Sequence, residues 1–231
     1  MSVLTVENVT HGFGARRILE GASFRLLKGE HVGLIGANGE GKSTFLHIIT
    51  GQLPPDEGRI EWSRRVTVGY LDQHAILTKG KTIRDILREA FQPMFDLEAE
   101  MLALYDKMSE ADEKSMDAMM ADVGDIQDTL EHSGFYTLDA KIEEVANGLG
   151  LGDIGLDRDV ADLSGGQRTK VLLTKLLLQN PTILILDEPT NYLDVEHIEW
   201  LKRYLRDYEN SFILVSHDIP FLNEVVNVIY H

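Results

Sequence analysis

The chain has 231 residues, of which 43% are hydrophobic, and this suits one large α/β domain with room for an attached subdomain. The absence of cysteine excludes disulfides and thiol chemistry and fits a reducing cytoplasm, and no apolar run nears the ~20 residues needed to span a bilayer. A formal net charge of −16 argues against general adhesion to nucleic acid, because Lys and Arg supply most of that affinity.

The first 71 residues have the pattern of strands interrupted by one helix. Polar and apolar residues alternate over 3–9, and segment 22–26 is short and apolar on one face. Segments 59–62 and 66–71 follow turn signals such as the Pro-Pro-Asp run at 54–56. The interrupting helix is expected at 45–49, so this part is predicted to be mainly β.

Residues 36–44 read GANGEGKST and stand between an apolar segment and the expected helix. In this context glycines turn backbone N–H groups towards phosphates, and the helix N-terminus attracts anions. Lys42 is expected to reach the β- and γ-phosphates, and Ser43 to bind Mg²⁺. The other nucleotide-binding candidates of the loop are Gly36, Asn38, Gly39, Gly41 and Thr44. This spacing arises by chance in roughly one chain in a hundred of this length, so the loop alone is not decisive.

Three segments are apolar throughout, at 31–35, 182–186 and 211–215. Continuous apolar strands are typical of a parallel sheet that helices cover on both faces. Each of them is followed by glycine-rich or ionisable residues: Gly36 onward, Asp187-Glu188 and Ser216-His217. Ligands bind outside the carboxyl ends of such strands, so these three ends are predicted to converge on one site.

The segment 94–141 is strongly acidic, with thirteen acids against three bases, and therefore holds ten of the sixteen excess negative charges. Apolar residues recur at helical spacing before and after a break at 109–115. They are Leu97, Met101, Leu104, Met108, Met119, Val123, Ile126 and Leu130. Two antiparallel helices are predicted, with a methionine-containing seam and a solvated acidic outer face. An adaptable docking surface is the alternative interpretation of the methionines.

Residues 163–167 read LSGGQ and open a helical stretch that an Asn-Pro pair closes at 180–181. A serine and two glycines at a helix start offer bare N–H groups to an anion. The candidate residues are Ser164, Gly165, Gly166 and Gln167. An ordinary helix N-cap followed by flexible glycines is the alternative interpretation.

Residues 183–188 read ILILDE, so an apolar strand delivers two adjacent carboxylates to its end. Asp187 suits a Mg²⁺ ion held through water, and Glu188 suits the base that polarises an attacking water. Taken alone, the pair would also fit a strand-to-loop cap. Together with the glycine loop, it favours a site that hydrolyses a nucleotide.

With these three motifs in this order, the chain resembles the ATP-binding cassette (ABC) family over nearly its whole length. The resemblance implies an α/β nucleotide-binding domain with a parallel P-loop sheet core, an N-terminal antiparallel β subdomain and an inserted helical subdomain. It divides the single domain, 1–231, into an ATP-binding core at 1–90 and 160–231 and a helical subdomain at about 91–159. It also implies Mg-ATP hydrolysis, with residues 164–167 reaching the ATP of a second cassette.

The resemblance suggests roles for four more residues. Gln73 matches the loop glutamine that senses Mg²⁺ and the attacking water, and His217 matches the switch histidine at the γ-phosphate. Asp194 falls in the loop that packs against the partner cassette. Phe13 occupies the region where an aromatic ring stacks on adenine, and a place in the core is the alternative for it.

Residues 187–194 read DEPTNYLD, which is similar to the ABC-F subfamily, except that its usual motif has histidine where this chain has Tyr192. The subfamily contains soluble tandem-cassette proteins, many of which bind the ribosome to aid translation or to give antibiotic resistance. Its members carry a helical arm in the interval where residues 94–141 lie. An arm this acidic is poorly suited to ribosomal RNA, so contact with ribosomal protein or docking on its own cassette is expected instead.

The last residues, 225–231, are expected to begin a strand, whereas family members continue through further elements. The chain is therefore expected to be the first cassette of a tandem protein. Three functions stay open at this stage: a ribosome-associated ABC-F factor, the ATP-binding subunit of a transporter, and a role in DNA metabolism, which the acidic composition disfavours.

Overall fold

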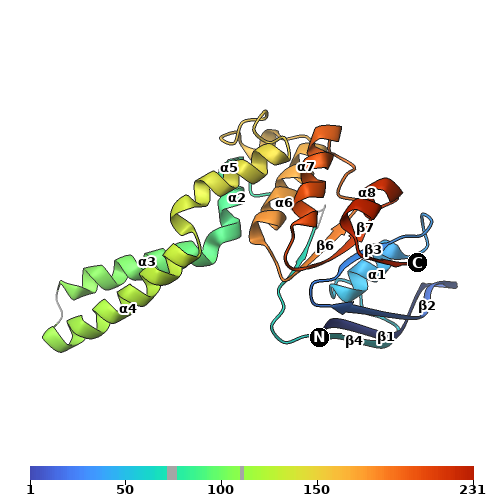
Figure 1. The fold of residues 1–231 in the computed structure, drawn as a ribbon, viewed down its shortest axis with the longest axis horizontal. Helices are drawn as coiled ribbons and strands as arrows, with labels where there is room; N and C mark the ends of the chain where they lie inside the picture. The colour runs from blue at the N-terminus through green and yellow to red at the C-terminus, as the bar shows by residue number, and fades with distance from the viewer. Residues whose placement is uncertain (72–76, 110–111) are drawn as a thin grey trace.

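The computed structural model describes residues 1–71, 77–109 and 112–231. The N-terminal part is mostly strands, a long helical insert follows it, and strands and helices alternate in the C-terminal part (Figure 1). In chain order they are β1 (Ser2–Phe13), β2 (Arg16–Leu27), β3 (His31–Leu34), α1 (Lys42–Ile49), β4 (Glu57–Trp62), β5 (Val68–Tyr70), α2 (Ile83–Arg88), η1 (Glu89–Phe91), α3 (Gln92–Met108), α4 (Glu113–His132), η2 (Phe135–Thr137), α5 (Leu138–Gly148), η3 (Val160–Asp162), α6 (Gly165–Gln179), β6 (Ile183–Asp187), α7 (Val195–Arg206), β7 (Ser211–Val215), α8 (Ile219–Val225) and β8 (Val228–Tyr230).

Two sheets form the body of the molecule. The larger has five strands in the order β5-β6-β7-β3-β8, and all of its pairings are parallel. The smaller is antiparallel, in the order β2-β1-β4. Val215 of β7 pairs with both Leu34 of β3 and Asp187 of β6, so the carboxyl ends of these three strands lie level. The structure confirms the predicted fold class and the predicted convergence of the three strand ends.

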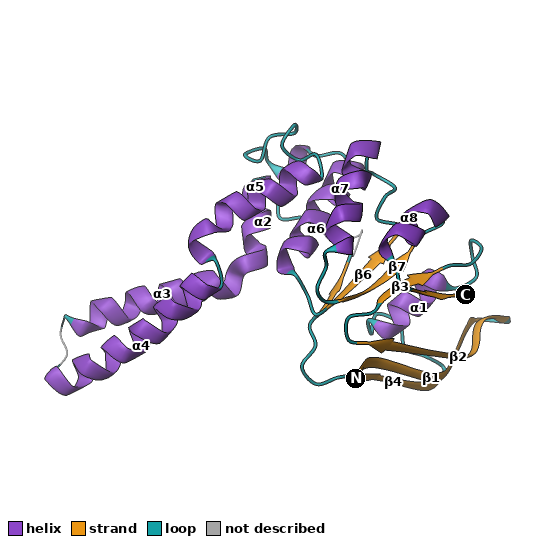
Figure 2. Ribbon diagram, viewed as in Figure 1, coloured by secondary structure: helices purple, strands orange, loops and turns teal. Residues whose placement is uncertain are grey.

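The parallel sheet separates two hydrophobic cores. Ile183 and Ile185 of β6 point into the core formed with α1, β1 and β2. Leu184 and Leu186 of the same strand point into the core formed with α5, α6, α7 and α8. Figure 2 shows these helices on one side of the sheet and the antiparallel strands on the other. Burial on both faces explains why the strands are apolar throughout.

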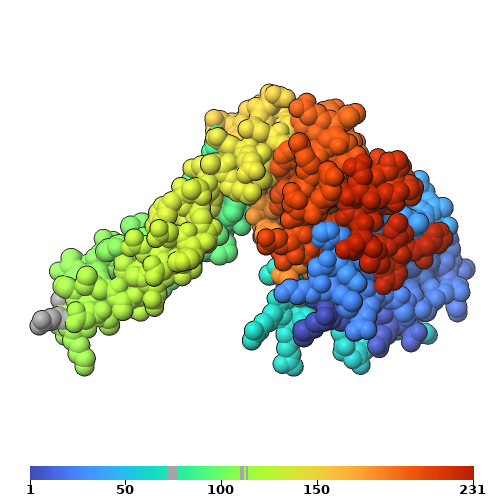
Figure 3. Space-filling model, viewed as in Figure 1, coloured from blue at the N-terminus to red at the C-terminus, as the bar shows by residue number. Residues whose placement is uncertain are grey.

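Helices α3 and α4 form an antiparallel hairpin that projects away from the body (Figure 3). Its predicted seam is confirmed, because Val123 and Leu130 are buried and the other six seam residues are half-buried, while the acidic side chains that the structure describes are exposed, except for half-buried Glu98. The predicted break between the helices is too long. Helix α4 already begins at Glu113, because the Asp112 carboxylate caps it by accepting a hydrogen bond from the Ser115 N–H at 2.9 Å.

Charged and aromatic contacts fasten the root of the hairpin to the body. The Glu89 carboxylate accepts hydrogen bonds from the ammonium groups of Lys81 and Lys175, both at 2.6 Å. Burial alone would raise the pKa of Glu89, but the two lysines hold this pKa below its usual range. The Arg88 guanidinium lies 5.1 Å from the centre of the Phe95 ring, as in a cation–π contact. The hairpin is therefore joined to α6, which carries Lys175.

Two helical glycines should respond to alanine in opposite directions. At Gly148 the new Cβ would collide with the Trp200 ring of α7, whereas at Gly124 it would meet nothing within 4 Å. We predict that Gly148→Ala lowers the free energy of unfolding by about 1–3 kcal/mol, because the close approach of α5 and α7 is lost. Gly124→Ala should raise it by up to about 1 kcal/mol through helix propensity. Urea denaturation followed by circular dichroism measures both, and shifts of the same sign would contradict this account.

Candidate active site

The loop between β3 and α1 has the backbone geometry of an anion cradle. Gly39 and Gly41 have φ values of +84° and +101°, in the left-handed region that favours glycine. A Cβ on Gly41 would lie 2.6 Å from Cγ2 of Ile18, so only glycine fits beneath β2. No described side chain caps the N-terminus of α1. The first N–H groups of this helix therefore stay available to an anionic ligand.

Lys42 reaches across this loop. Its ammonium donates hydrogen bonds to the carbonyl oxygens of Gly36 at 2.7 Å and Ala37 at 2.9 Å. A hollow of about 190 Å³ lies beside it. Eight residues predicted for the site line this hollow: Asn38, Gly39, Gly41, Lys42, Ser43, Thr44, Asp187 and Glu188. The structure therefore brings the glycine loop and the end of β6 together, as the sequence predicted.

Ser43 and Asp187 meet at the floor of the hollow. The Ser43 hydroxyl donates a hydrogen bond to Oδ2 of Asp187 at 2.7 Å, although the two residues are 144 positions apart. Mg²⁺ prefers oxygen ligands, usually one or two protein groups together with phosphates and waters. A hydroxyl and a carboxylate this close together fit one such ion.

Glu188 is held in an unusual backbone conformation, with φ at +47°, which is rare for a residue other than glycine. Its N–H donates to the carbonyl oxygen of Val215 at 2.9 Å, which ties the end of β6 to that of β7. Its carboxylate lies 2.9 Å from Nδ1 of His217, which follows β7. The Glu188 side chain is 20% exposed and that of His217 is 73% exposed, so the pair opens towards solvent. Such local strain is typical of functional positions.

A second group of predicted residues lies elsewhere and does not line the hollow. Ser164 is the N-cap of α6, where its hydroxyl accepts from the Gln167 N–H at 3.3 Å and the Gln167 side chain accepts from the Ser164 N–H at 2.9 Å. The Tyr192 ring lies close to Gly166, at 3.2 Å from the place a Cβ would take. Lys170 of α6 lies 3.7 Å from the Asp194 carboxylate. The LSGGQ helix and residues 192–194 thus form one unit within the chain.

Two further predicted residues lie at the edge of the described site or outside it. Phe13 ends β1 and is 57% exposed, so it is not a core residue. It pairs with Arg16, whose guanidinium donates to the Gly39 carbonyl at 3.4 Å, so this hairpin end lies beside the glycine loop. Gln73 falls outside the described residues.

Three residues of the site were not predicted from the sequence: Ile18 and Val215, which line the hollow, and Glu40. Ile18 of β2 lines the hollow and packs on Gly41, which only the three-dimensional path of β2 reveals. Glu40 lies in the loop itself, and its carboxylate accepts a hydrogen bond from the Ala37 N–H. An acid within an anion-binding loop is unusual, so the sequence alone could have singled out Glu40.

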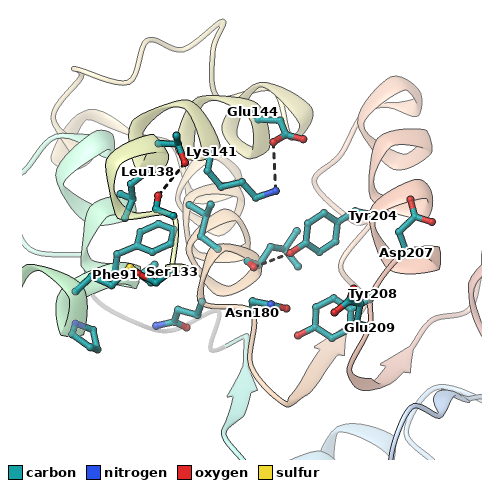
Figure 4. Close-up of a pocket in the computed structure, with 18 of the residues that line it drawn as sticks. Phe91, Ser133, Leu138, Lys141, Glu144, Asn180, Tyr204, Asp207, Tyr208 and Glu209 are labelled. Carbon is teal, nitrogen blue, oxygen red and sulfur yellow. Dashed lines mark hydrogen bonds and ion pairs between the residues drawn. The ribbon is translucent and has the colours of Figure 1, made fainter. Parts of the chain in front are cut away.

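A larger groove, of about 940 Å³, lies at the root of the hairpin between α5, α6 and α7 (Figure 4). None of the predicted site residues that the structure describes lines this groove. Burial raises the pKa of Tyr204 to about 12, so its hydroxyl stays protonated and donates to the Leu177 carbonyl at 2.9 Å. The groove is therefore a junction between the insert and the body, separate from the glycine loop.

A glycine loop that joins a parallel strand to a helix, with Lys42 across it and the Ser43–Asp187 pair below, defines a P-loop nucleotide-binding domain. A sequence model of the family described as ABC transporter matches residues 19–191. The chain belongs to this family, whose ATPase domain binds and hydrolyses ATP.

Three curated relatives illustrate the similarity. An uncharacterised ABC transporter ATP-binding protein of Bacillus subtilis, YfmM, is 66% identical over 231 residues, which are 100% of this chain and 45% of YfmM. ABC transporter F family member 2 of Arabidopsis thaliana is 36% identical over 97% of this chain and 34% of its own length. The energy-dependent translational throttle protein EttA of Mycobacterium tuberculosis is 34% identical over 96% of this chain and 39% of its own length. The chain thus spans less than half the length of each.

The position of Glu188 leads to a prediction about hydrolysis. We expect Glu188→Gln to slow ATP hydrolysis by about 10²–10⁴-fold, because the amide cannot accept a proton from water. Binding of ATP should persist, since the loop and Lys42 are unchanged. Phosphate release and nucleotide binding measure the two effects, and Glu196→Gln on the exposed start of α7 is the matched control. Normal hydrolysis by Glu188→Gln would remove this residue from the mechanism.

Proposed function

We propose that the chain is an ABC-F type cassette that couples ATP-driven closure against a second cassette to ribosome-associated translation or antibiotic resistance. The main support for pairing with a second cassette is that the predicted site residues lie in two separate places. The hollow with Lys42 and Glu188 holds one set of predicted residues, whereas Ser164 and Asp194 do not line it. A head-to-tail partner would bring its own LSGGQ helix to the nucleotide and so complete the site.

Within this proposal the predicted residues in and around the hollow have defined tasks. The loop amides and Lys42 bind the phosphates, and Ser43 and Asp187 hold Mg²⁺, with Gln73 as a further ligand. The metal ion, when bound, neutralises charge on the transferred phosphoryl group. Glu188 orients the attacking water and accepts its proton, and His217 donates a hydrogen bond to the γ-phosphate. Phe13 stacks on the adenine.

The second half of the site has its own tasks in the same proposal. Ser164, Gly165, Gly166 and Gln167 contact the nucleotide held by the partner, and Asp194 packs against the partner's surface. The capping box at the start of α6 presents these residues on a rigid helix end. We retain the division into an ATP-binding core, 1–90 and 160–231, and a helical subdomain, about 91–159.

Two features support the ABC-F assignment over other branches of the family. The DEPTNYLD segment resembles that subfamily, and the α3–α4 hairpin occupies the interval in which its members carry an arm. A relative named as an F family member and a relative named as a translational throttle protein are 36% and 34% identical. A tandem arrangement agrees with the 45% of the Bacillus protein that the chain spans. We propose a cytoplasmic location and the ribosome as partner.

The ATP-binding subunit of a transporter is the second candidate, and the family's description and the printed name of the Bacillus relative favour it. Among the described residues, no helix is long and apolar enough to cross a membrane. As the ATP-binding subunit of a transporter, the chain would act together with a membrane domain. A role in DNA metabolism fits the net charge of −16 poorly.

Pairing predicts that hydrolysis depends on the concentration of this chain. The rate per molecule should rise steeply as the concentration approaches the dissociation constant of a head-to-tail dimer, because each monomer has only half of each site. Ser164→Arg should abolish the rise, because its large side chain disables the half-site that each chain supplies to its partner. Mixing Ser164→Arg with Glu188→Gln should restore activity, since one of the two composite sites is then intact. A constant rate per molecule would contradict the pairing model.

Ribosome association can be tested with the longer protein that contains this cassette. Glu188→Gln, with the matching change in any second cassette, should hold the closed state in ATP. We expect co-sedimentation with ribosomes in ATP and not in ADP. If the protein binds ATP but does not co-sediment with ribosomes in either nucleotide, the ATPase assignment would stand and the ribosome-associated role would be rejected. The ATP-binding subunit of a transporter would then become the leading function.

A further inference from the structure

Glu40 places a carboxylate inside the phosphate-binding loop. Its Oε2 accepts a hydrogen bond from the backbone N–H of Ala37 at 2.5 Å. The same oxygen lies 2.7 Å from the position that a Cβ on Gly36 would take. The first glycine of the loop therefore leaves the room into which this carboxylate fits.

Lys42 and Glu40 both bind Ala37 of the loop, through side chains of opposite charge, and Lys42 also binds Gly36. The Lys42 ammonium binds the carbonyl oxygens of Gly36 and Ala37, and the Glu40 carboxylate binds the Ala37 N–H. The carboxylate thus makes the kind of contact that a phosphate oxygen makes with such a loop, namely an anionic oxygen on a backbone donor. Because it carries the charge of a phosphate oxygen, the two anions cannot share the loop without repulsion.

We propose that Glu40 is a built-in competitor of the nucleotide's phosphates and weakens their binding. The inference rests on the proposed nucleotide-binding role of the loop and adds a residue that sets the affinity. When phosphates enter, the Glu40 side chain leaves the Ala37 N–H and turns into solvent. Glu40 is exposed, so this movement has access to water and needs no rearrangement of the core. The competition lowers the affinity for the phosphates and does not change the affinity for the base.

A structural brace is the opposing explanation of the same contact. If the bond between Glu40 and Ala37 only holds the loop in its binding shape, removing the carboxylate would loosen the loop and weaken phosphate binding. The two explanations therefore predict opposite signs. Glu40→Gln separates charge from shape, because the amide oxygen can still accept from the Ala37 N–H.

Equilibrium binding of a fluorescent ATP analogue, Mg-pyrophosphate and adenosine tests the proposal with the catalytic residues intact. We expect Glu40→Ala to bind ATP and pyrophosphate roughly tenfold more tightly, which is the scale of one charge-assisted hydrogen bond. Glu40→Gln should show a smaller gain, and adenosine should bind all forms equally. Glu131→Gln on the exposed face of α4 removes the same charge far from the loop and should change nothing.

Unchanged or weaker phosphate binding by Glu40→Ala would overturn the proposal, and weaker binding would establish the brace. An equal gain for adenosine would also overturn it, because competition acts on phosphates alone. If no form binds ATP or pyrophosphate, the nucleotide site itself fails together with the proposed function. If all forms bind ATP with one dissociation constant, only the role of Glu40 fails.

Discussion

The parallel register of β3, β7 and β6 is the constraint on which the rest of the structure depends. Val215 stands level with Leu34 on one side and with Asp187 on the other, so the glycine loop, His217 and the two carboxylates begin at the same height. A slip of β6 by one residue would exchange its two sets of apolar side chains between the cores. Close packing of each set against its own neighbours thus favours one register, and that register brings Ser43 within 2.7 Å of Asp187.

Rigid strands allow the turns that follow them to hold unfavourable conformations. Glu188 has a φ of +47° and directly follows β6, whose first four residues are buried. Its N–H bond to Val215 and the contact with His217 hold the carboxylate in place. Backbone strain of this kind persists only where the surrounding structure determines it more than once. The stability of the sheet therefore supports the geometry of the site.

Sequence patterns predicted the features that depend on period and local chemistry. The bounds of β7 at 211–215 and the helical seam of α3 and α4 are as predicted, because apolar period reports burial directly. Helices α2 and α5 were not predicted, since they are short and acquire their stability from packing on α6. The ion pair between Lys170 and Asp194 could not be predicted from the sequence either, because it depends on a tertiary contact. The role of Gln73 stays a prediction.

Helix α6 connects the two parts of the molecule that the proposed function needs to couple. Its first turn carries the capping box of Ser164, and Lys175, one turn before its end, binds Glu89 at the root of the hairpin. An α-helix of this length behaves as a rigid rod of roughly 20 Å. A partner that displaces the hairpin would therefore act on the same rigid body that carries Ser164, the residue proposed to meet the second cassette. Lys170, between these points, extends the connection to Asp194, so nucleotide and partner would bias one shared element.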